Sequence, residues 1–267
     1  MQSKAQLYYF IDILEHTYDL ETLSRTYFPH SGLNIRNLQL STGVKRRQVE
    51  MLVKEGASNQ LTVPEQETMF CFIKLPLTPK QRFISAFIDS LPKTVQVRRE
   101  GEIKDLRISE LVYGDLIYLE EGEVCPADCR ILSCENLLVD VTTIKGKNFP
   151  PMEVTTYATD ALPLKTQNLV FAGSKVLRGK GFGLVIAVGN RCVQVRVIDY
   201  LMSLGQQTQM PKGMQSPASE KNVKGTPPQA NKQNPPERAQ SVYGTSPLSE
   251  KGLRTRSSIK LTPSSSL

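Results

Sequence analysis

Few residues in this chain have the type and spacing needed for chemistry. Its only two histidines, His16 and His30, have no credible nucleophile partner in the sequence, which argues against acyl transfer. The run Lys145-Gly146-Lys147-Asn148 reads as a basic turn. An ordinary lysine, with a pKa of about 10.4, is protonated at neutral pH. Such a turn can contact an anion but cannot accept a proton.

Metal and nucleotide sites are not indicated. Cys125, Cys129 and Cys134 are separated by three and four residues, without a Cys-x-x-Cys pair or a nearby histidine to complete a zinc site. We expect these thiols to pack in or near strands. Gly179-Lys180-Gly181-x-Gly183 lacks the strand-turn-helix context of a phosphate loop, and Lys175, Arg178 and Lys180 read as surface charge. The prediction is no cofactor and no metal.

The charge of the chain is unevenly distributed. The 267 residues carry 33 Lys and Arg against 26 Asp and Glu, a net charge of +7. From Leu201 onward there are nine Lys and Arg and three Glu, a surplus of six. The rest of the chain is therefore close to neutral. Binding of nucleic acid or a membrane surface through the basic tail ranks last, because the tail lacks aromatic interleaving and a dense cation cluster.

Targeting signals are not apparent in the sequence. No apolar run approaches the ~18–20 residues that span a bilayer, and the apolar start at Leu7–Ile11 is broken by Asp12 and Glu15. Five cysteines, an odd number, favour reduced thiols. We therefore expect a cytoplasmic protein without a transmembrane segment.

The N-terminal part, residues 1–64, is predicted to be a small helical region. Asp19 is a plausible N-cap for a short helix that carries Leu20, Leu23 and Tyr27. A second helix should run from Val44 to Glu55 and stop at Gly56. Its inward residues are expected to be Val49, Leu52 and Val53, and Lys45, Arg46 and Arg47 should form a solvated face rather than a nucleic-acid patch.

Residues 65–92 read as a connector interrupted by prolines. Within it, residues 81–91 predict an amphipathic helix that should pack on the next domain rather than lie on a membrane, because its polar face is poor in cations. Its inward side is expected to hold Phe83, Ile84, Phe87, Ile88 and Leu91.

Residues 93–205 are predicted to be a β domain. Short strands are expected from Thr94 to about Ile198, separated by glycine-rich turns, which is typical of a β-sandwich or jelly roll. The expected strands begin at Thr94 and continue at residues 116–119, 130–133, 137–141, 169–171, 175–177 and 182–188.

The tail, residues 206–267, is rich in Pro, Ser, Lys and Gln and has one aromatic residue, Tyr243. It cannot bury enough surface to offset its ordering entropy, so we expect disorder. Phosphorylation would add negative charge and change its partners. The candidate phosphorylation sites are Ser216, Thr226, Ser246, Ser257, Ser258 and Thr262.

Five ordered motifs resemble the actuator domain of P-type cation pumps, especially the sodium/potassium and proton/potassium pumps. They are Gly114-Asp115, residues 122–130 (Gly-Glu-Val-Cys-Pro-Ala-Asp-Cys-Arg), Val139-Asp140, residues 168–174 (Asn-Leu-Val-Phe-Ala-Gly-Ser) and Gly189-Asn190-Arg191. The resemblance extends over roughly residues 15–210. It implies a distorted jelly roll, mainly β with α, after the helical region and before the tail.

The same resemblance implies that the basic turn, residues 145–148, corresponds to the catalytic loop of the family. The family's loop reads Thr-Gly-Glu-Ser, and its Glu helps hydrolyse an aspartyl phosphate; here Lys145, Lys147 and Asn148 depart from it and Gly146 remains. The loop is therefore expected to be degenerate. Either its cations contact an anion or acidic partner, or the loop drifted once catalysis was no longer required; we favour drift.

The chain thus resembles the cytosolic front of a pump without its membrane, phosphorylation and nucleotide-binding segments. We expect a non-catalytic pseudo-actuator, not an enzyme, that binds proteins, with a P-type pump as candidate partner and any membrane association peripheral through that pump. The alternative is an accessory component of a cation-transporting ATPase that acts in ion transport with other chains.

Overall fold

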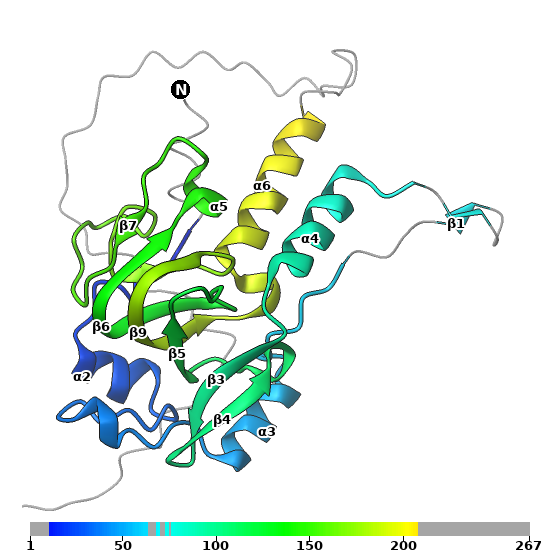
Figure 1. Cartoon of the computed structure of the whole chain (residues 1–267). Helices are drawn as coiled ribbons and strands as arrows, with labels where there is room; N and C mark the ends of the chain where they lie inside the picture. The colour runs from blue at the N-terminus through cyan, green and yellow to red at the C-terminus, as the bar shows by residue number, and fades with distance from the viewer. Residues whose placement is uncertain (1–10, 64–67, 70–72, 75, 208–267) are drawn as a thin grey trace, which may run out of the picture. The chain divides into compact units, whose positions relative to one another are not determined.

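A computed structural model of the chain describes residues 11–63, 68–69, 73–74 and 76–207 (Figure 1). Residues 208–267 of the predicted tail, with the six candidate phosphorylation sites, lie outside the described residues, whereas residues 206 and 207 are the end of a helix and not of a disordered tail. No helix within the described ranges is long and apolar enough to cross a membrane.

The N-terminal segment begins with a short irregular helix. A turn of α-helix, α2 (Leu20–Thr22), continues directly into a π-helical turn, η1 (Leu23–Tyr27). The Asp19 carboxylate accepts a hydrogen bond from Thr22 N at 2.7 Å, which confirms the predicted N-cap.

Helix α3 (Arg46–Lys54) follows the 3-10 turn η2 (Leu38–Leu40). Gly56, with φ of 73°, ends the helix region as predicted. Leu52 is buried, but Val53 is 44% exposed, so the predicted inward position of Val53 is wrong. Residues 52 and 53 are 100° apart around a helix, and only one of them can face the interior here.

Helix α4 (Pro79–Ser90) starts earlier than predicted. Thr78 is its N-cap and forms a capping box with Gln81, and Pro79 occupies the first helical position. Ile84, Phe87 and Leu91 are buried, which confirms packing on the domain. The predicted inward position of Phe83 is wrong, because its side chain is 57% exposed and lies off the buried face.

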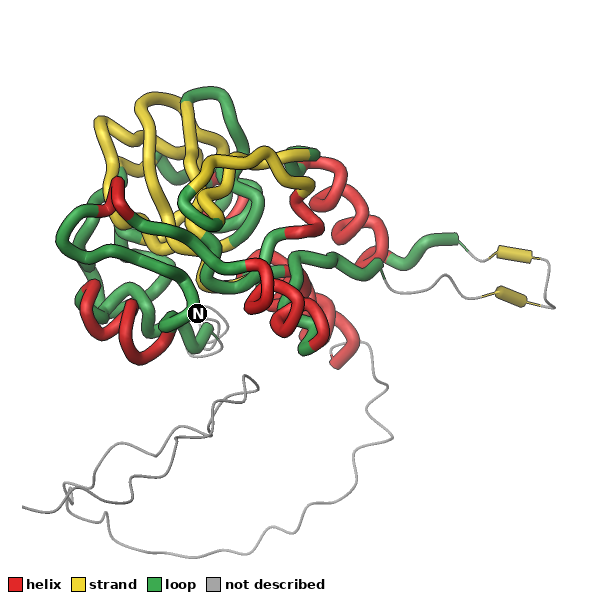
Figure 2. The backbone as a smooth tube through the Cα atoms, turned by 90° about the horizontal axis from the view of Figure 1, so that it is seen from below, coloured by secondary structure: helices red, strands yellow, loops and turns green. Residues whose placement is uncertain are grey.

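One seven-stranded antiparallel sheet forms the centre of the fold, in the order β4-β3-β5-β9-β6-β7, with β8 also paired to β6. Figure 2 shows these strands gathered together with helices at their border. The strands are β3 (Thr94–Arg99), β4 (Glu102–Arg107), β5 (Leu116–Glu120), β6 (Asp128–Asp140), β7 (Met152–Glu153), β8 (Leu169–Val170) and β9 (Lys175–Ala187). A separate two-stranded ladder joins β1 (Thr68–Met69) to β2 (Ile73–Lys74).

Two long strands replace four short ones that the sequence predicted. The expected segments at 130–133 and 137–141 fall in β6, which ends one residue earlier at Asp140, and those at 175–177 and 182–188 fall in β9, which ends one residue earlier at Ala187. Register shifts between Glu135 and Leu138 bend β6 without ending it. Strand β4 was not predicted, because charged residues dominate it and only Ile103 and Leu106 are apolar.

Beyond Ala187 the structure departs from the strand prediction. A 3-10 turn, η4 (Gly189–Arg191), leads into helix α6 (Val193–Gln207). Helix α6 lies beside α4, and Lys80 forms an ion pair with Asp199 at 2.9 Å (Figure 1). Residues 193–198 therefore belong to a helix, whose buried members are Val193, Val195 and Ile198.

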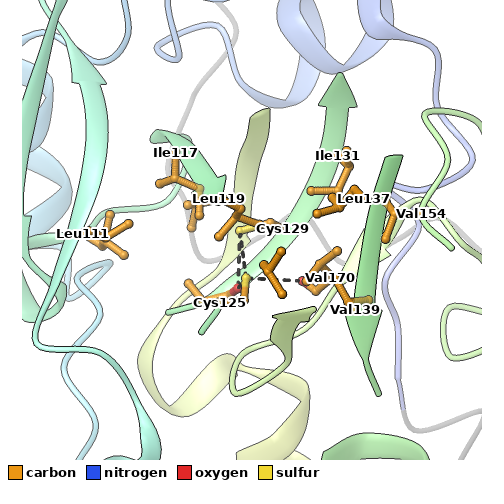
Figure 3. Close-up of a cluster of buried hydrophobic side chains, with 14 of the residues drawn as sticks. Leu111, Ile117, Leu119, Cys125, Cys129, Ile131, Leu137, Val139, Val154 and Val170 are labelled. Carbon is orange, nitrogen blue, oxygen red and sulfur yellow. Dashed lines mark hydrogen bonds between the residues drawn. The ribbon is translucent and has the colours of Figure 1, made fainter. Parts of the chain in front are cut away.

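The described residues form three apolar cores: two are built on this sheet, and a smaller third joins α4 to α6 through Phe87, Leu91 and Val195. The first is built almost entirely from strands and their turns, with Ile117, Leu119, Ile131 and Val139 at its centre (Figure 3). The second joins sheet residues to the N-terminal segment, which contributes Ile11, Ile13, Leu23, Phe28 and Leu33. The N-terminal segment thus completes a core of the β domain instead of folding over a core of its own.

Candidate functional site

The predicted degenerate loop lies between β6 and β7. Helix α5 (Thr142–Lys145) opens it and ends at Gly146, whose φ of 95° is the conformation that favours glycine. The Asp140 carboxylate accepts a hydrogen bond from Thr142 N at 2.8 Å, and Phe149 N donates to Gly146 O at 3.2 Å. We call residues 142–149 the β6–β7 loop. Its backbone is thus held at both ends by local hydrogen bonds.

The side chains of this loop present cations to solvent. Lys147 and Asn148 are exposed, and Phe149 is 51% exposed. Lys145 is half-buried, with Nζ 3.6 Å from the Met152 sulfur, and burial lowers its pKa. The loop therefore offers positive charge and one exposed aromatic ring.

A carboxylate that could activate water is missing from the loop. Residues 141–152 contain no Asp or Glu. On one side, Asp140 uses its Oδ1 to bind the backbone of Thr142. On the other, Glu153 lies in β7, opposite Leu138. The described side chains of the loop can contact anions, but none of them can serve as a carboxylate base.

One glycine ties the loop to helix α4. Thr143 Oγ1 donates to Gly173 O at 3.1 Å. Gly173 has φ of 84°, and a Cβ there would lie 3.0 Å from Phe87 Cε2 and 3.4 Å from Thr143 Cγ2. The absence of a side chain at this position lets the loop and α4 approach each other.

Two acidic residues of the resemblance motifs, Asp115 and Asp128, have structural roles. Asp115 is fully buried and accepts bonds from Arg99 Nε at 2.8 Å, from Arg99 Nη2 at 2.5 Å and from Val112 N at 2.8 Å. Burial raises the pKa of Asp115, and the Arg99 guanidinium opposes that shift. This pair joins the end of β3 to the turn before β5.

Asp128 has a similar structural role. Its two oxygens accept hydrogen bonds from Ala172 N at 2.9 Å and Val193 N at 2.7 Å. Burial raises the pKa of Asp128 to about 6, against the lowering effect of these two bonds and of the Arg196 charge. The side chain therefore joins β6 to the turn after β8 and to the first residue of α6.

Arg130 and Asn168 hold the segment between β7 and β8. Arg130 Nη2 donates to Thr156 O at 2.7 Å, and burial lowers the pKa of Arg130 to about 10. Asn168 Nδ2 donates to His16 O at 2.9 Å, and its Oδ1 accepts from Thr166 Oγ1 at 2.8 Å. These motif residues position backbone and do not line an open site.

The last motif, Gly189-Asn190-Arg191, forms hydrogen bonds with the N-terminal segment. Gly189 N donates to Asn59 Oδ1 at 2.7 Å, and Asn59 Nδ2 donates to Pro126 O at 3.1 Å. Asn190 bonds Thr62 through both ends of its amide. Asn59 lies in residues 55–64, which resemble the N-terminal region of cation pumps, but the sequence did not predict that it is buried and bridges two motifs far apart in the chain.

The histidines are structural as well. His16 Nε2 lies 3.0 Å from Ala161 O, and His30 Nε2 lies 3.0 Å from Tyr113 O. Burial lowers the pKa of both side chains. Each therefore joins the N-terminal segment to the β domain through a backbone carbonyl.

Cys125, Cys129 and Cys134 pack in or next to strand β6, as predicted, and Cys134 is half-buried. Cys125 and Cys129 are fully buried with their sulfurs 3.9 Å apart among apolar side chains (Figure 3). Burial raises the pKa of Cys129 well above its usual range, and so disfavours a reactive thiolate. The predicted surface cations Lys175, Arg178 and Lys180 are exposed on β9.

Parts of this chain are similar in sequence to known proteins. A family model described as the P-type ATPase actuator domain matches residues 89–201. The sodium/potassium-transporting ATPase subunit alpha-A of Artemia franciscana is 33% identical over 134 residues, which are 50% of this chain and 13% of that protein. Subunit alpha-2 of Homo sapiens is 32% identical over 127 residues, 48% of this chain and 12% of that protein.

Among solved structures, a zinc-transporting PIB-type ATPase in the E2.Pi state matches with 22% identity and a TM-score of 0.36, covering 48% of this chain and 19% of that chain. The stretch aligned with the Artemia franciscana subunit covers about 13% of the length of that protein. Residues 89–201, which include the seven-stranded sheet, therefore match the family model of the P-type ATPase actuator domain.

Proposed function

We propose that this chain is a non-catalytic pseudo-actuator that binds other proteins. The observation that carries the proposal is the composition of the β6–β7 loop, where exposed Lys147 occupies the position at which the family resemblance expects a Glu. A protonated lysine repels a cation and attracts a carboxylate or phosphate, and it cannot take a proton from water. Recognition is the role that such a loop can still support.

The surrounding structure supports the same proposal. Thr143 and Gly146 keep the loop in a defined conformation, through the bond to Gly173 O and the positive φ. Asp115 and Asp128, the buried acids of the motifs, are bound to backbone N–H groups and take no part in an exposed site. The fold is thus maintained by bonds that do not depend on the composition of the loop.

The proposed partner is a cytosolic domain of a P-type cation pump. Relatives named as sodium/potassium-transporting ATPase α subunits share 27–33% identity with about half of this chain. Related domains commonly keep surfaces that fit the same neighbours, so a pump is the natural candidate. The protein would then act in the cytoplasm and reach a membrane only through the pump.

A binding experiment with a phosphorylated pump tests the proposal. Membranes that contain a sodium/potassium pump are phosphorylated with ATP, the tagged full chain is added, and co-sedimentation and decay of the aspartyl phosphate are measured. We expect binding without faster decay. Lys147→Glu should weaken binding, whereas Lys180→Glu, an exposed cation on β9, should not. If the tagged chain did not co-sediment with the pump-containing membranes, the result would count against the proposal.

The alternative function is an accessory component of a cation-transporting ATPase. The identity with sodium/potassium pump α subunits is the observation that favours it. It predicts that the chain accelerates phosphoenzyme turnover in the same assay. A variant without residues 206–267 shows whether binding depends on the basic tail, because tail-borne binding disappears with the deletion and falls steeply with salt.

A further inference from the structure

The edge of the sheet at β4 is an unused pairing surface. Strand β4 pairs only with β3 among the described strands, and four of its six residues are exposed. Ile103 is 53% exposed, so its apolar side chain is available to a neighbouring strand. An exposed edge of this kind can template pairing with another strand.

The turn between β3 and β4 decides which backbone groups point outward. Glu100 and Gly101 form a two-residue turn with φ of 55° and 84°, as type I′ turns require. The residues flanking such a turn, Arg99 and Glu102, form a hydrogen-bonded pair, and bonded pairs recur at every second position.

The far end of the hairpin keeps this alternation. Ile108 N donates to Lys93 O at 3.1 Å, as the same series of pairs requires. The N–H and C=O groups of Ile103 and Asp105 therefore point away from β3. These groups form the hydrogen-bonding edge that a further strand would meet.

Charge decides which strand fits this edge. In an antiparallel pair, residues whose backbone faces outward must lie opposite each other. A second copy of β4 centred on Ile103 places Ile103 opposite itself, and places Glu102 opposite Lys104 of the second copy on both sides. Shifting the centre to Lys104 or Asp105 instead places two like charges directly opposite, which is unfavourable.

The remaining register is also disfavoured. Centring on Leu106 requires hydrogen bonds from Arg107 N, which already donates to Glu110 Oε2 at 3.0 Å. It also extends past the end of β4 into the 3-10 turn η3 (Ile108–Glu110). The register centred on Ile103 combines an apolar pair with two opposite-charge pairs. Its backbone hydrogen bonds join Ile103 to Ile103 of the second copy, because Gly101 N, which would face Asp105, already donates to Thr42 O at 2.6 Å.

We propose that this protein self-associates through β4, as a two-fold symmetric antiparallel pair centred on Ile103. The second copy is the occupant whose charges match the edge, and the interface is isologous. The exposed Ile103 side chains bury each other, and Lys104, which lies 3.3 Å from Glu102 within one chain, gains a second Glu102 across the dyad. The small interface predicts a Kd on the order of 100 µM.

Charge-swap variants of the full chain test this register. Sedimentation velocity over ~5–500 µM should show a monomer–dimer equilibrium for the wild type. Glu102→Lys and Lys104→Glu each create two like-charge contacts and should raise Kd roughly tenfold. The double variant Glu102→Lys/Lys104→Glu restores opposite charges and should return Kd to within roughly threefold of the wild type. Glu21→Lys, which changes the net charge equally at a distant exposed site, is the control.

Each result decides the proposal. A wild type that stays monomeric across the range overturns it, as does a dimer that neither single variant weakens. A double variant as weak as the singles would show that the register is wrong. Because Glu102→Lys and Lys104→Glu change net charge in opposite directions, equal weakening by both supports the pairing and excludes a general charge effect.

Discussion

Val193 N donates a hydrogen bond of 2.7 Å to Asp128, and this contact joins the start of strand β6 to the first residue of helix α6. The other Asp128 oxygen binds Ala172 N at 2.9 Å. Three segments distant in sequence thus meet at one buried carboxylate. The contact explains why a motif Asp persists at a site that has no exposed chemistry.

Replacing this carboxylate should destabilise the fold. Asp128→Asn keeps the size but directs an amide N–H₂ at one of two backbone donors, which leaves that donor unsatisfied. We expect a loss of about 1–3 kcal/mol in the free energy of unfolding, measured by urea denaturation. Asp89→Asn, at an exposed position on α4, should change it by less than about 0.5 kcal/mol. Equal effects of the two substitutions would contradict the role of Asp128.

The same residue should make stability depend on pH. Since the folded pKa of Asp128 is about 6 and the unfolded value is 3.8, the folded state binds this proton more tightly. The stabilisation is fully present below the unfolded pKa and is lost as pH rises through about 6. From pH 7.5 to pH 5 the wild type should gain on the order of 1.4 kcal/mol relative to Asp128→Asn. Parallel pH profiles of the two proteins would refute this.

Glycine substitutions separate backbone strain from packing at the loop. Gly173→Ala and Gly122→Ala both place a side chain at positive φ, but only the first meets neighbours within 4 Å. Gly122→Ala should cost about 1–2 kcal/mol from the backbone alone. Gly173→Ala should cost at least about 1 kcal/mol more, because Phe87 must move. Thermal unfolding of both variants is the measurement, and similar melting temperatures would show that Gly173 does not couple the loop to α4.

The two aromatic residues of α4 should differ sharply. Phe87 is 5% exposed and packs with Leu91 and Val195, whereas Phe83 is 57% exposed. Phe87→Ala should cost about 3–5 kcal/mol of unfolding free energy, and Phe83→Ala less than about 0.5 kcal/mol. Urea denaturation gives both values. A large effect of Phe83→Ala would indicate that its side chain is covered.

Sequence patterns located most helices and strands but not their continuity. The predicted N-cap at Asp19 and the stop at Gly56 were confirmed, since both depend on local backbone bonding. The long strands β6 and β9 were divided, because a bulge or a mid-strand glycine looks like a turn when the partner strand is unknown. Val53 and Phe83 were placed inward, because periodicity does not determine how wide a buried face is.

By itself, the sequence determined the fold class, the order of the motifs and the absence of a carboxylate in the β6–β7 loop, because these are properties of residue type and spacing. Only the tertiary structure decided that Asn59, His16 and His30 join the N-terminal segment to the β domain, and that this segment completes a shared core. It also decided that Asp115 and Asp128 are buried and bound to backbone N–H groups. Such contacts link residues up to 152 positions apart, and no local pattern encodes which distant groups will meet.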